Sequence, residues 1–253
     1  MKVITYGREN KNVIVLLHGG GLSWWNFRSQ AEMLCGEYRV ELPVLDGHAG
    51  SDRDFSGIGT NAEELIDYID RSFGGHVLAL GGLSLGAQIA AETLSRRPDI
   101  CRCALLESPA LIPDRATAAL LGPSISASYG LIRKPWFSRA QFRSLKMDPR
   151  FFDDYYRDSC AVSRENLIAF TRASQEYSLD PRIGETRARV LIAAGEKELP
   201  RILRSAKLLH ERLPGSELRT LPGLYHGQFS LNRPEEYVSA LRALIAGEAG
   251  AEP

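Results

Sequence analysis

The residues Gly82-Leu83-Ser84-Leu85-Gly86 form a Gly-x-Ser-x-Gly pattern between an apolar run and a segment of helical periodicity. Residues 77–80 are continuously apolar, as in a buried parallel strand, and residues from Gln88 onward recur at helical spacing. A serine on so sharp a turn has a strained backbone, and its hydroxyl projects above the sheet. Because a helix start carries free N–H groups and a partial positive charge, the Leu85 amide is well placed to stabilise an oxyanion formed at Ser84.

A serine hydroxyl is a weak nucleophile unless a base removes its proton, and that base needs a third group to fix its tautomer. Of the five histidines, only His226 follows a late strand at the sheet edge expected for Ser84, since parallel strands share one exit edge. A surface or structural role is the alternative for His226. Of the other four, His18 is expected to orient a glycine loop and His48 to lie in a loop. His76 is expected at the opposite end of the sheet, and His210 is expected to be solvated.

Three glutamates are candidates for the acid that orients the histidine. Glu198 lies three residues after Gly195, at the exit of the strand that precedes the last one. Glu196 is its nearest rival, and Glu107, at the exit of the strand after the serine helix, is a third candidate. Each of the three could instead be an ordinary solvated charge.

These residues require a sheet of parallel strands that alternate with helices. Buried strands are predicted at residues 13–17, 77–80, 101–106 and 189–194, where apolar residues predominate, and short strands at residues 3–6, 38–43 and 217–221. Helices are expected after Ser23, which can cap the first of them, and from the capping-box spacing of Thr60 and Glu63 through Phe73. Further helices are expected at residues 88–97, 201–213 and 234–246, and the small polar residues from Gly247 onward predict a frayed tail.

Residues 110–180 interrupt the alternation of strands and helices. They are rich in helix formers, with breaks expected at Pro113, Gly122-Pro123, Pro135 and Pro149. We therefore expect an α/β core of residues 1–109 and 181–253 and a helical cap of residues 110–180. The aromatic residues of the cap either roof a pocket or form the core of the cap. A cluster of basic residues in the cap either favours an acidic substrate or forms a solvated face: Arg133, Lys134, Arg139, Arg143 and Lys146.

Length and charge limit the class of protein. The 253 residues suit one large α/β domain with an inserted subdomain, and the 31 acidic and 31 basic residues create no overall field for nucleic acid or an anionic membrane. No signal-peptide core or membrane span is expected. The absence of CxxC spacing predicts a reduced, cytoplasmic setting for the cysteines Cys35, Cys101, Cys103 and Cys160.

Taken together, the pattern resembles the α/β-hydrolase superfamily over nearly the whole chain. The shared segments, in order, are His18-Gly19-Gly20 after a buried strand, residues 42–51, the turn at residues 82–86, the helical insertion, Gly195-Glu196-Lys197-Glu198, and residues 222–226 before the last helix. The order serine, acid, histidine is the order of this fold. The resemblance implies that Ser84 is the nucleophile, His226 the base and Glu198 the acid.

The resemblance also implies an oxyanion hole formed by the amides of Leu85 and Gly20, with Gly21 as the alternative second donor. Two positions depart from the family pattern. The acid position holds Glu instead of the commoner Asp, which leaves open which acid acts. Ala49 stands where the family often has Gly, and this difference has little bearing on catalysis.

The leading hypothesis is a serine hydrolase that cleaves a small carboxylic ester through an acyl-enzyme on Ser84, without cofactor or metal. A small-molecule substrate is the expected partner, nucleic acid and a membrane are not expected, and the oligomeric state is left open. The first alternative is a lyase or C–C bond hydrolase that keeps the same triad, and the second is a non-catalytic ligand-binding module. An epoxide or haloalkane hydrolase is disfavoured, because such enzymes need Asp at position 84.

Overall fold

A seven-stranded, mostly parallel sheet forms the centre of residues 1–247, the part of the chain that the computed structural model describes. Its strands are β1 (Lys2–Tyr6), β2 (Val13–Leu17), β3 (Arg39–Val44), β4 (Val77–Leu83), β5 (Cys101–Glu107), β6 (Arg189–Gly195) and β7 (Glu217–Leu221). Their order in space is β1-β3-β2-β4-β5-β6-β7. Only β1 is antiparallel to its neighbour. The predicted α/β fold with a mostly parallel sheet is thus confirmed.

The apolar runs explain which strands lie inside. All five residues of β2 are buried, and β4, β5 and β6 each have a single residue that is not. The edge strands β1 and β7 are only half-buried, as expected where one side of the sheet has no partner strand. The register pairs Leu83 with Glu107 and Glu107 with Ala193, so the exits of the three central strands meet at one edge.

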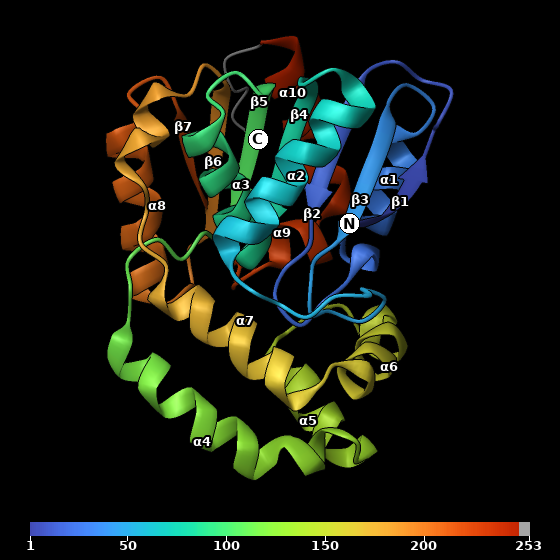
Figure 1. The fold of residues 1–253 in the computed structure, drawn as a ribbon, viewed down its shortest axis with the longest axis vertical. Coiled ribbons are helices and arrows are strands. Elements are labelled where there is room, and N and C mark those ends of the chain that lie inside the picture. The colour runs from blue at the N-terminus through green and yellow to red at the C-terminus, as the bar shows by residue number, and fades with distance from the viewer. Residues whose placement is uncertain (248–253) are drawn as a thin grey trace.

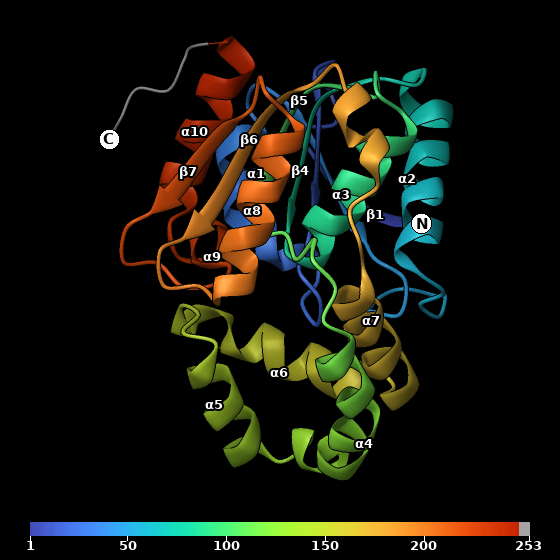
Figure 2. The same ribbon diagram turned by 90° about the vertical axis from the view of Figure 1, so that its left-hand side faces the viewer.

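Helices cover both faces of the sheet (Figures 1 and 2). One apolar cluster joins the sheet to α2 (Ile58–Phe73), α3 (Leu85–Arg96) and α8 (Pro200–Arg212). A second cluster, on the other face, includes the buried residues of α1 (Arg28–Leu34) and α10 (Pro234–Ala246). The shorter elements are the 3₁₀ helices η1 (Trp24–Phe27) and η3 (Pro181–Glu185) and the five-residue α9 (Gln228–Asn232).

The segment between β5 and β6 forms a separate helical layer beyond the strand exits (Figures 1 and 2). It contains α4 (Arg115–Ile132), α5 (Pro135–Ser144), η2 (Pro149–Phe151), α6 (Phe152–Ala161) and α7 (Arg164–Glu176). We call it the α4–α7 layer. The division of the chain into a core of residues 1–109 and 181–253 and a cap of residues 110–180 stays a prediction.

One expected break in this layer is wrong. The helix α4 continues through Pro123, although a proline removes one helical hydrogen bond. Pro123 is exposed, and so is Ala119, whose carbonyl oxygen loses its partner. Water can hydrate that oxygen, so the helix is not forced to end. Breaks do occur at Pro113, Pro135 and Pro149, each of which precedes or begins a helix.

Two predicted helix caps are also wrong. Ser23 precedes η1 but makes no capping bond, because its hydroxyl donates to the carbonyl of Ala49 at 3.2 Å. The helix α2 begins at Ile58 with Gly57 as its N-cap, so Thr60 lies inside the helix. At Ser23 a contact with a neighbouring segment replaces the capping bond, whereas α2 simply begins earlier in the chain than the capping-box spacing indicates. The frayed tail predicted from Gly247 concerns residues 248–253, which lie outside the described residues.

Polar contacts fasten the α4–α7 layer to the core. Trp25 donates its indole N–H to Asp158 of α6 at 2.8 Å, and Gln88 of α3 donates to the carbonyls of Ala110 and Ser174 at 2.5 and 2.8 Å. The Gln88 bonds tie both ends of the layer to the helix that begins next to Ser84, and the Trp25 bond ties α6 to η1.

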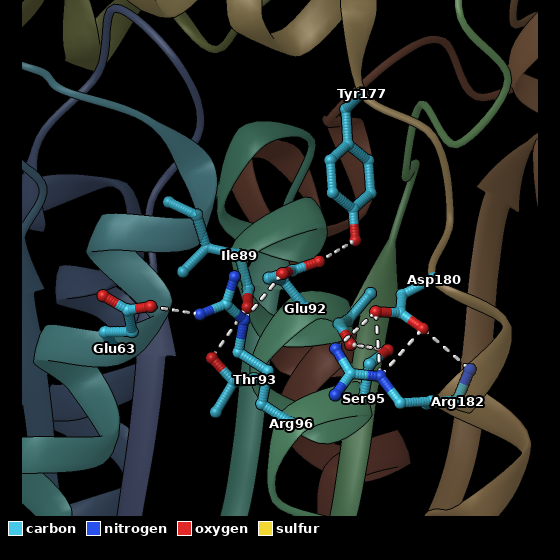
Figure 3. A network of polar contacts seen from close by, with 10 residues as sticks. Glu63, Ile89, Glu92, Thr93, Ser95, Arg96, Tyr177, Asp180 and Arg182 are labelled. Atoms are coloured by element: carbon cyan, nitrogen blue, oxygen red, sulfur yellow. Dashed lines mark hydrogen bonds and ion pairs between the residues drawn. The ribbon is translucent and has the colours of Figure 1, made fainter.

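A partly exposed ionic network adds a third attachment (Figure 3). The Arg96 guanidinium lies between Glu63 and Glu92, at 2.5 and 2.7 Å, and the Tyr177 hydroxyl donates to Glu92 at 2.9 Å. Tyr177 directly follows α7, so the returning chain is anchored on α3.

Among residues 1–247, every helix is too short or too polar to span a membrane.

The four cysteines are free thiols. Cys101 and Cys103 are buried in β5, and burial raises the pKa of the Cys103 thiol to about 11, which keeps it protonated.

Candidate active site

The turn after β4 holds Ser84 in a conformation that few non-glycine residues adopt. Its φ is 52° and its ψ is −110°, and it is the N-cap residue of α3. The flanking glycines permit this turn. A Cβ at Gly82 would collide with the backbone of Gly86, and a Cβ at Gly86 would collide with the carbonyl of Leu17 on the neighbouring strand.

Three side chains from distant parts of the sequence meet above this turn. Nε2 of His226 lies 3.0 Å from Oγ of Ser84, and Nδ1 of His226 lies 2.8 Å from Oε2 of Glu198. An ionised carboxylate can only accept, so Nδ1 carries the proton and Nε2 is left as the acceptor for the serine hydroxyl. This is the tautomer that a general base requires.

Glu198 is the carboxylate that contacts the histidine. Its other oxygen, Oε1, accepts from the Ser108 hydroxyl at 2.5 Å and from the Gly195 amide at 2.9 Å. Burial favours the neutral acid, but the hydrogen bond and charge of His226, together with the bonds from Ser108 and Gly195, outweigh burial and lower the pKa of Glu198. The carboxylate is therefore ionised at neutral pH.

The same interaction acts on the histidine in the opposite direction. Desolvation of the ring opposes protonation, but the hydrogen bond and negative charge of Glu198 outweigh it, and the pKa of His226 is raised above its ordinary value. The imidazolium that would form during proton transfer is thereby stabilised.

The two rival acids do not reach His226 by hydrogen bonding. Glu196 is exposed and accepts from the Gly223 amide at 2.8 Å. Glu107 is buried and accepts from the amides of Phe229 and Ser230, at 3.0 and 3.2 Å, in the short helix that follows His226. Of the three predicted candidates, the structure thus brings only Glu198 to the histidine.

Glu107 is the most perturbed carboxyl near the site. Burial raises its pKa to about 7, with the bonds from Ser230 opposing this shift and the charge of Glu198 adding to it. Its carboxyl group binds the short helix that follows His226. Because its pKa is about 7, Glu107 is partly protonated at neutral pH.

The other histidines lie away from Ser84 or serve the framework. Nε2 of His18 accepts from the Leu45 amide at 3.1 Å, and Nδ1 lies 2.9 Å from the Gly19 carbonyl, so the ring ties the glycine loop to the loop after β3. His48 is buried against Phe170, and burial lowers its pKa to about 4. His76 contacts the carbonyl of Asp99, and His210 contacts the hydroxyl of Ser216.

Backbone amides near Ser84 are available to bind an oxyanion. The amides of Gly20, of the alternative donor Gly21 and of Leu85 donate to no acceptor within residues 1–247. Gly20 and Leu85 lie side by side, since a Cβ at Gly20 would lie 3.6 Å from Cβ of Leu85. The amide of Gly19, by contrast, is occupied by the side chain of Asn26 at 3.1 Å.

A cavity of about 420 Å³ opens over these groups. Ser84, His226 and Gly20 line it together with apolar side chains of the core and of the α5–η2 loop, namely Leu22, Leu83, Leu145, Met147, Leu199 and Leu231. A second cavity, of about 210 Å³, continues beneath the α4–α7 layer and shares Gly20, Leu22 and Leu145 with the first. The site therefore offers a largely apolar space next to the serine hydroxyl.

The cap aromatics divide between the two roles left open by the sequence. Tyr155 and Phe170 line the second cavity, whereas Phe142 and Phe151 are buried in the apolar cluster of the α4–α7 layer and the core. Trp136 is 65 % exposed and serves neither role.

The sequence reasoning missed Ser108 and Lys197. Ser108 directly follows Glu107 at a strand exit, and this position was the only available signal for it. Lys197 lies in the sequence segment that carries the acid but is given no role of its own there, and it lines the cavity. Within residues 1–247, no group of three or more His, Cys, Asp or Glu side chains is arranged to hold a metal ion.

A parallel sheet with a serine on a strand-to-helix turn, facing a histidine from a late loop, defines the α/β-hydrolase class. Residues 14–240 match the model of the alpha/beta hydrolase family, and the chain belongs to that family. No protein of curated function matches the sequence.

Several solved structures share the fold at low identity. An esterase from Thermogutta terrifontis is 18 % identical with a TM-score of 0.79, over 98 % of this chain and 94 % of that one. An esterase from Exiguobacterium antarcticum is 20 % identical with a TM-score of 0.80, over 97 % and 94 % of the two chains. An enol-lactonase from Burkholderia xenovorans is 14 % identical with a TM-score of 0.80, over 97 % and 96 %. At these identities the similarity shows the fold alone.

Proposed function

We propose that the protein is a serine hydrolase that cleaves a small carboxylic ester through an acyl-enzyme on Ser84. The observation that carries this proposal is the 3.0 Å contact between Oγ of Ser84 and Nε2 of His226, with Nδ1 of the same ring 2.8 Å from Glu198. A serine that is hydrogen-bonded to an oriented histidine is the arrangement that activates a hydroxyl as nucleophile.

The reaction runs in two halves. Oγ of Ser84 attacks the ester carbonyl while Nε2 of His226 takes its proton, and Glu198 stabilises the imidazolium. The amides of Gly20 and Leu85 bind the oxyanion of the tetrahedral intermediate, with Gly21 as the alternative second donor. His226 then returns the proton to the departing alcohol, and a water molecule deprotonated by the same ring hydrolyses the acyl-serine.

Two further observations support the proposal. The cavity over Ser84 is lined mainly by apolar side chains, which suits the carbon chain of a small ester. Esterases are also among the solved structures that share the fold, although their low identity leaves the substrate open.

The test combines labelling with turnover. A fluorophosphonate probe is expected to modify Ser84, as located by peptide mass spectrometry, and p-nitrophenyl butyrate is expected to be hydrolysed. Both activities should disappear in Ser84→Ala, with circular dichroism showing that the variant is folded. An unlabelled Ser84 in folded protein would contradict the proposal. A labelled serine without turnover of any ester would favour the lyase or C–C hydrolase alternative, and tight ligand binding without turnover would favour a binding module.

A further inference from the structure

Three non-glycine residues in residues 1–247 have a positive φ, and all of them lie in or beside the active-site cavity. They are Ser84 at 52°, Ser108 at 53° and Lys146 at 54°. Such backbone strain persists only where the surrounding structure imposes it, and it gathers at functional sites. Ser84 carries the hydroxyl that contacts His226, and the Ser108 hydroxyl donates to Glu198. Lys146 has no role in the proposed ester cleavage.

The backbone of Lys146 is held by the segment that carries His226. Its carbonyl accepts from Nε2 of Gln228 at 2.7 Å and from Nδ2 of Asn232 at 3.0 Å. Gln228 also accepts from the amide of Tyr225 at 2.9 Å. The loop of the α4–α7 layer is thereby fixed against α9, and the Lys146 side chain has a defined place at the cavity.

The Lys146 ammonium lies over an aromatic ring at the cavity rim. Nζ is 3.2 Å from the ring centroid of Tyr225, and Nζ of Lys197, from the core, is 5.5 Å from the same centroid. An aromatic face attracts a cation but does not neutralise its charge. Both lysines line the cavity together with Ser84 and His226.

Within residues 1–247, the positive charge at the rim has no carboxylate as counter-charge. Neither lysine forms an ion pair with a carboxylate in the described chain. The only acid that lines the cavity is Glu198, and its oxygens are already used by His226, Ser108 and Gly195. Two cations beside a mainly apolar cavity leave room for an anionic group of the ligand.

We propose that Lys146 and Lys197 form an anion subsite that selects substrates carrying a carboxylate or phosphate in addition to the scissile ester. The proposal rests on the ester cleavage proposed above and names its substrate class. The charged group would lie at the rim between the two ammonium groups, and the apolar part of the substrate would lie against the leucines of the cavity. Of the basic residues that cluster in the α4–α7 layer, only Lys146 lines this cavity.

The test compares esters that differ only in charge. Mono-p-nitrophenyl adipate carries a carboxylate, and p-nitrophenyl 6-methylheptanoate has the same shape without the charge. A second pair has a chain two methylenes longer: mono-p-nitrophenyl suberate and the neutral p-nitrophenyl ester in which an isopropyl group replaces its carboxylate. The measured quantity is the ratio of kcat/KM for the anionic ester to kcat/KM for the neutral one. We expect a ratio above one at low salt, falling towards one as salt screens the rim.

Substitutions then assign the effect. Lys146→Met and Lys197→Met are each expected to lower the ratio about threefold, and the double variant about tenfold, as for partly exposed charge pairs. Lys146→Arg should retain the preference. The control is Lys134→Met, which removes the same charge from an exposed site outside the cavity and should leave the ratio as in the wild type.

The outcomes separate the two proposals. Ester turnover with a wild-type ratio at or below one for both chain lengths, or an equal fall in Lys134→Met, would overturn the anion subsite and leave the esterase intact. If no ester is cleaved, titration calorimetry with adipate decides. Binding that is weakened in the folded double variant would support the subsite without the esterase, and equal binding in both proteins would overturn it.

Discussion

The hydroxyl of Ser108 donates to Oε1 of Glu198 at 2.5 Å, and this bond leaves Oε2 to face His226. The Gly195 amide, at 2.9 Å, shares Oε1 with Ser108. The two carboxylate oxygens are thus divided between the framework and the histidine. The contacts therefore hold the carboxylate in one orientation, with Oε2 towards Nδ1 of His226.

Replacement of Glu198 tests which acid acts. In Glu198→Gln the amide oxygen can still accept from Ser108 and Gly195, so the NH₂ group would face Nδ1 of His226 and favour the wrong tautomer. We expect kcat for ester hydrolysis to fall by a factor on the order of 10²–10⁴. The matched control is Glu196→Gln at the exposed rival position, where kcat should change less than about twofold. Equal losses in both variants would show that Glu198 has no special role.

The pH dependence of the reaction reports on His226. Its pKa is raised, chiefly by Glu198 against the opposing effect of desolvation, and only the neutral ring can take the serine proton. Activity should therefore be lost as pH falls through the raised pKa, so the rising limb of kcat/KM should have its midpoint above about 6.5. Stopped-flow rates with a neutral ester between about pH 5 and 9 measure this midpoint. A midpoint below the ordinary histidine value would contradict the assignment.

The stability of the fold should carry the signature of Glu107. Burial raises its pKa to about 7, so the folded state binds a proton more tightly than the unfolded state. The folded state holds more protons between about pH 4.5 and 7, and stability must fall as pH rises through that window. Relative to Glu107→Gln, the wild type should lose up to about 3 kcal/mol across it. Urea unfolding of both proteins at several pH values measures the difference, and parallel pH profiles would argue against a protonated Glu107.

The tight turn predicts a contrast between two glycines. Gly86→Ala would push a Cβ into the carbonyl of Leu17, in a place where neither backbone can move without disturbing the sheet. We expect a loss of about 3 kcal/mol or more, or failure to fold. Gly130 lies within α4 and has nothing within 4 Å of such a Cβ. Gly130→Ala should therefore be neutral or stabilising by up to about 1 kcal/mol. Thermal unfolding of both variants distinguishes the steric cost from the general effect of replacing glycine.

The sequence alone determined the elements that depend on short apolar runs and local breaks. The strands at residues 13–17 and 217–221 and the helix at residues 234–246 match the predicted bounds. The run at residues 13–17 is fully buried and the helix at residues 234–246 packs its apolar face in the second cluster, so periodicity is enough to find both. The edge strand at residues 217–221 has no buried residue, and its bounds follow from the Pro-Gly turns on either side. The strand-to-helix turn at Ser84 was readable for a similar reason, since only glycine fits the crowded positions beside it.

Only the tertiary structure decided among residues with equal local signals. Glu107, Glu196 and Glu198 all follow strand exits, but their side chains reach two helix amides, a surface amide and His226, respectively. The five basic residues of the helical layer likewise look alike in the sequence, yet only Lys146 lines the cavity. The physical reason is that a side chain's direction and its partners depend on segments distant in the sequence, from 27 residues for Glu196 to 122 for Glu107, whose approach is fixed by packing of the whole sheet and not by any local pattern.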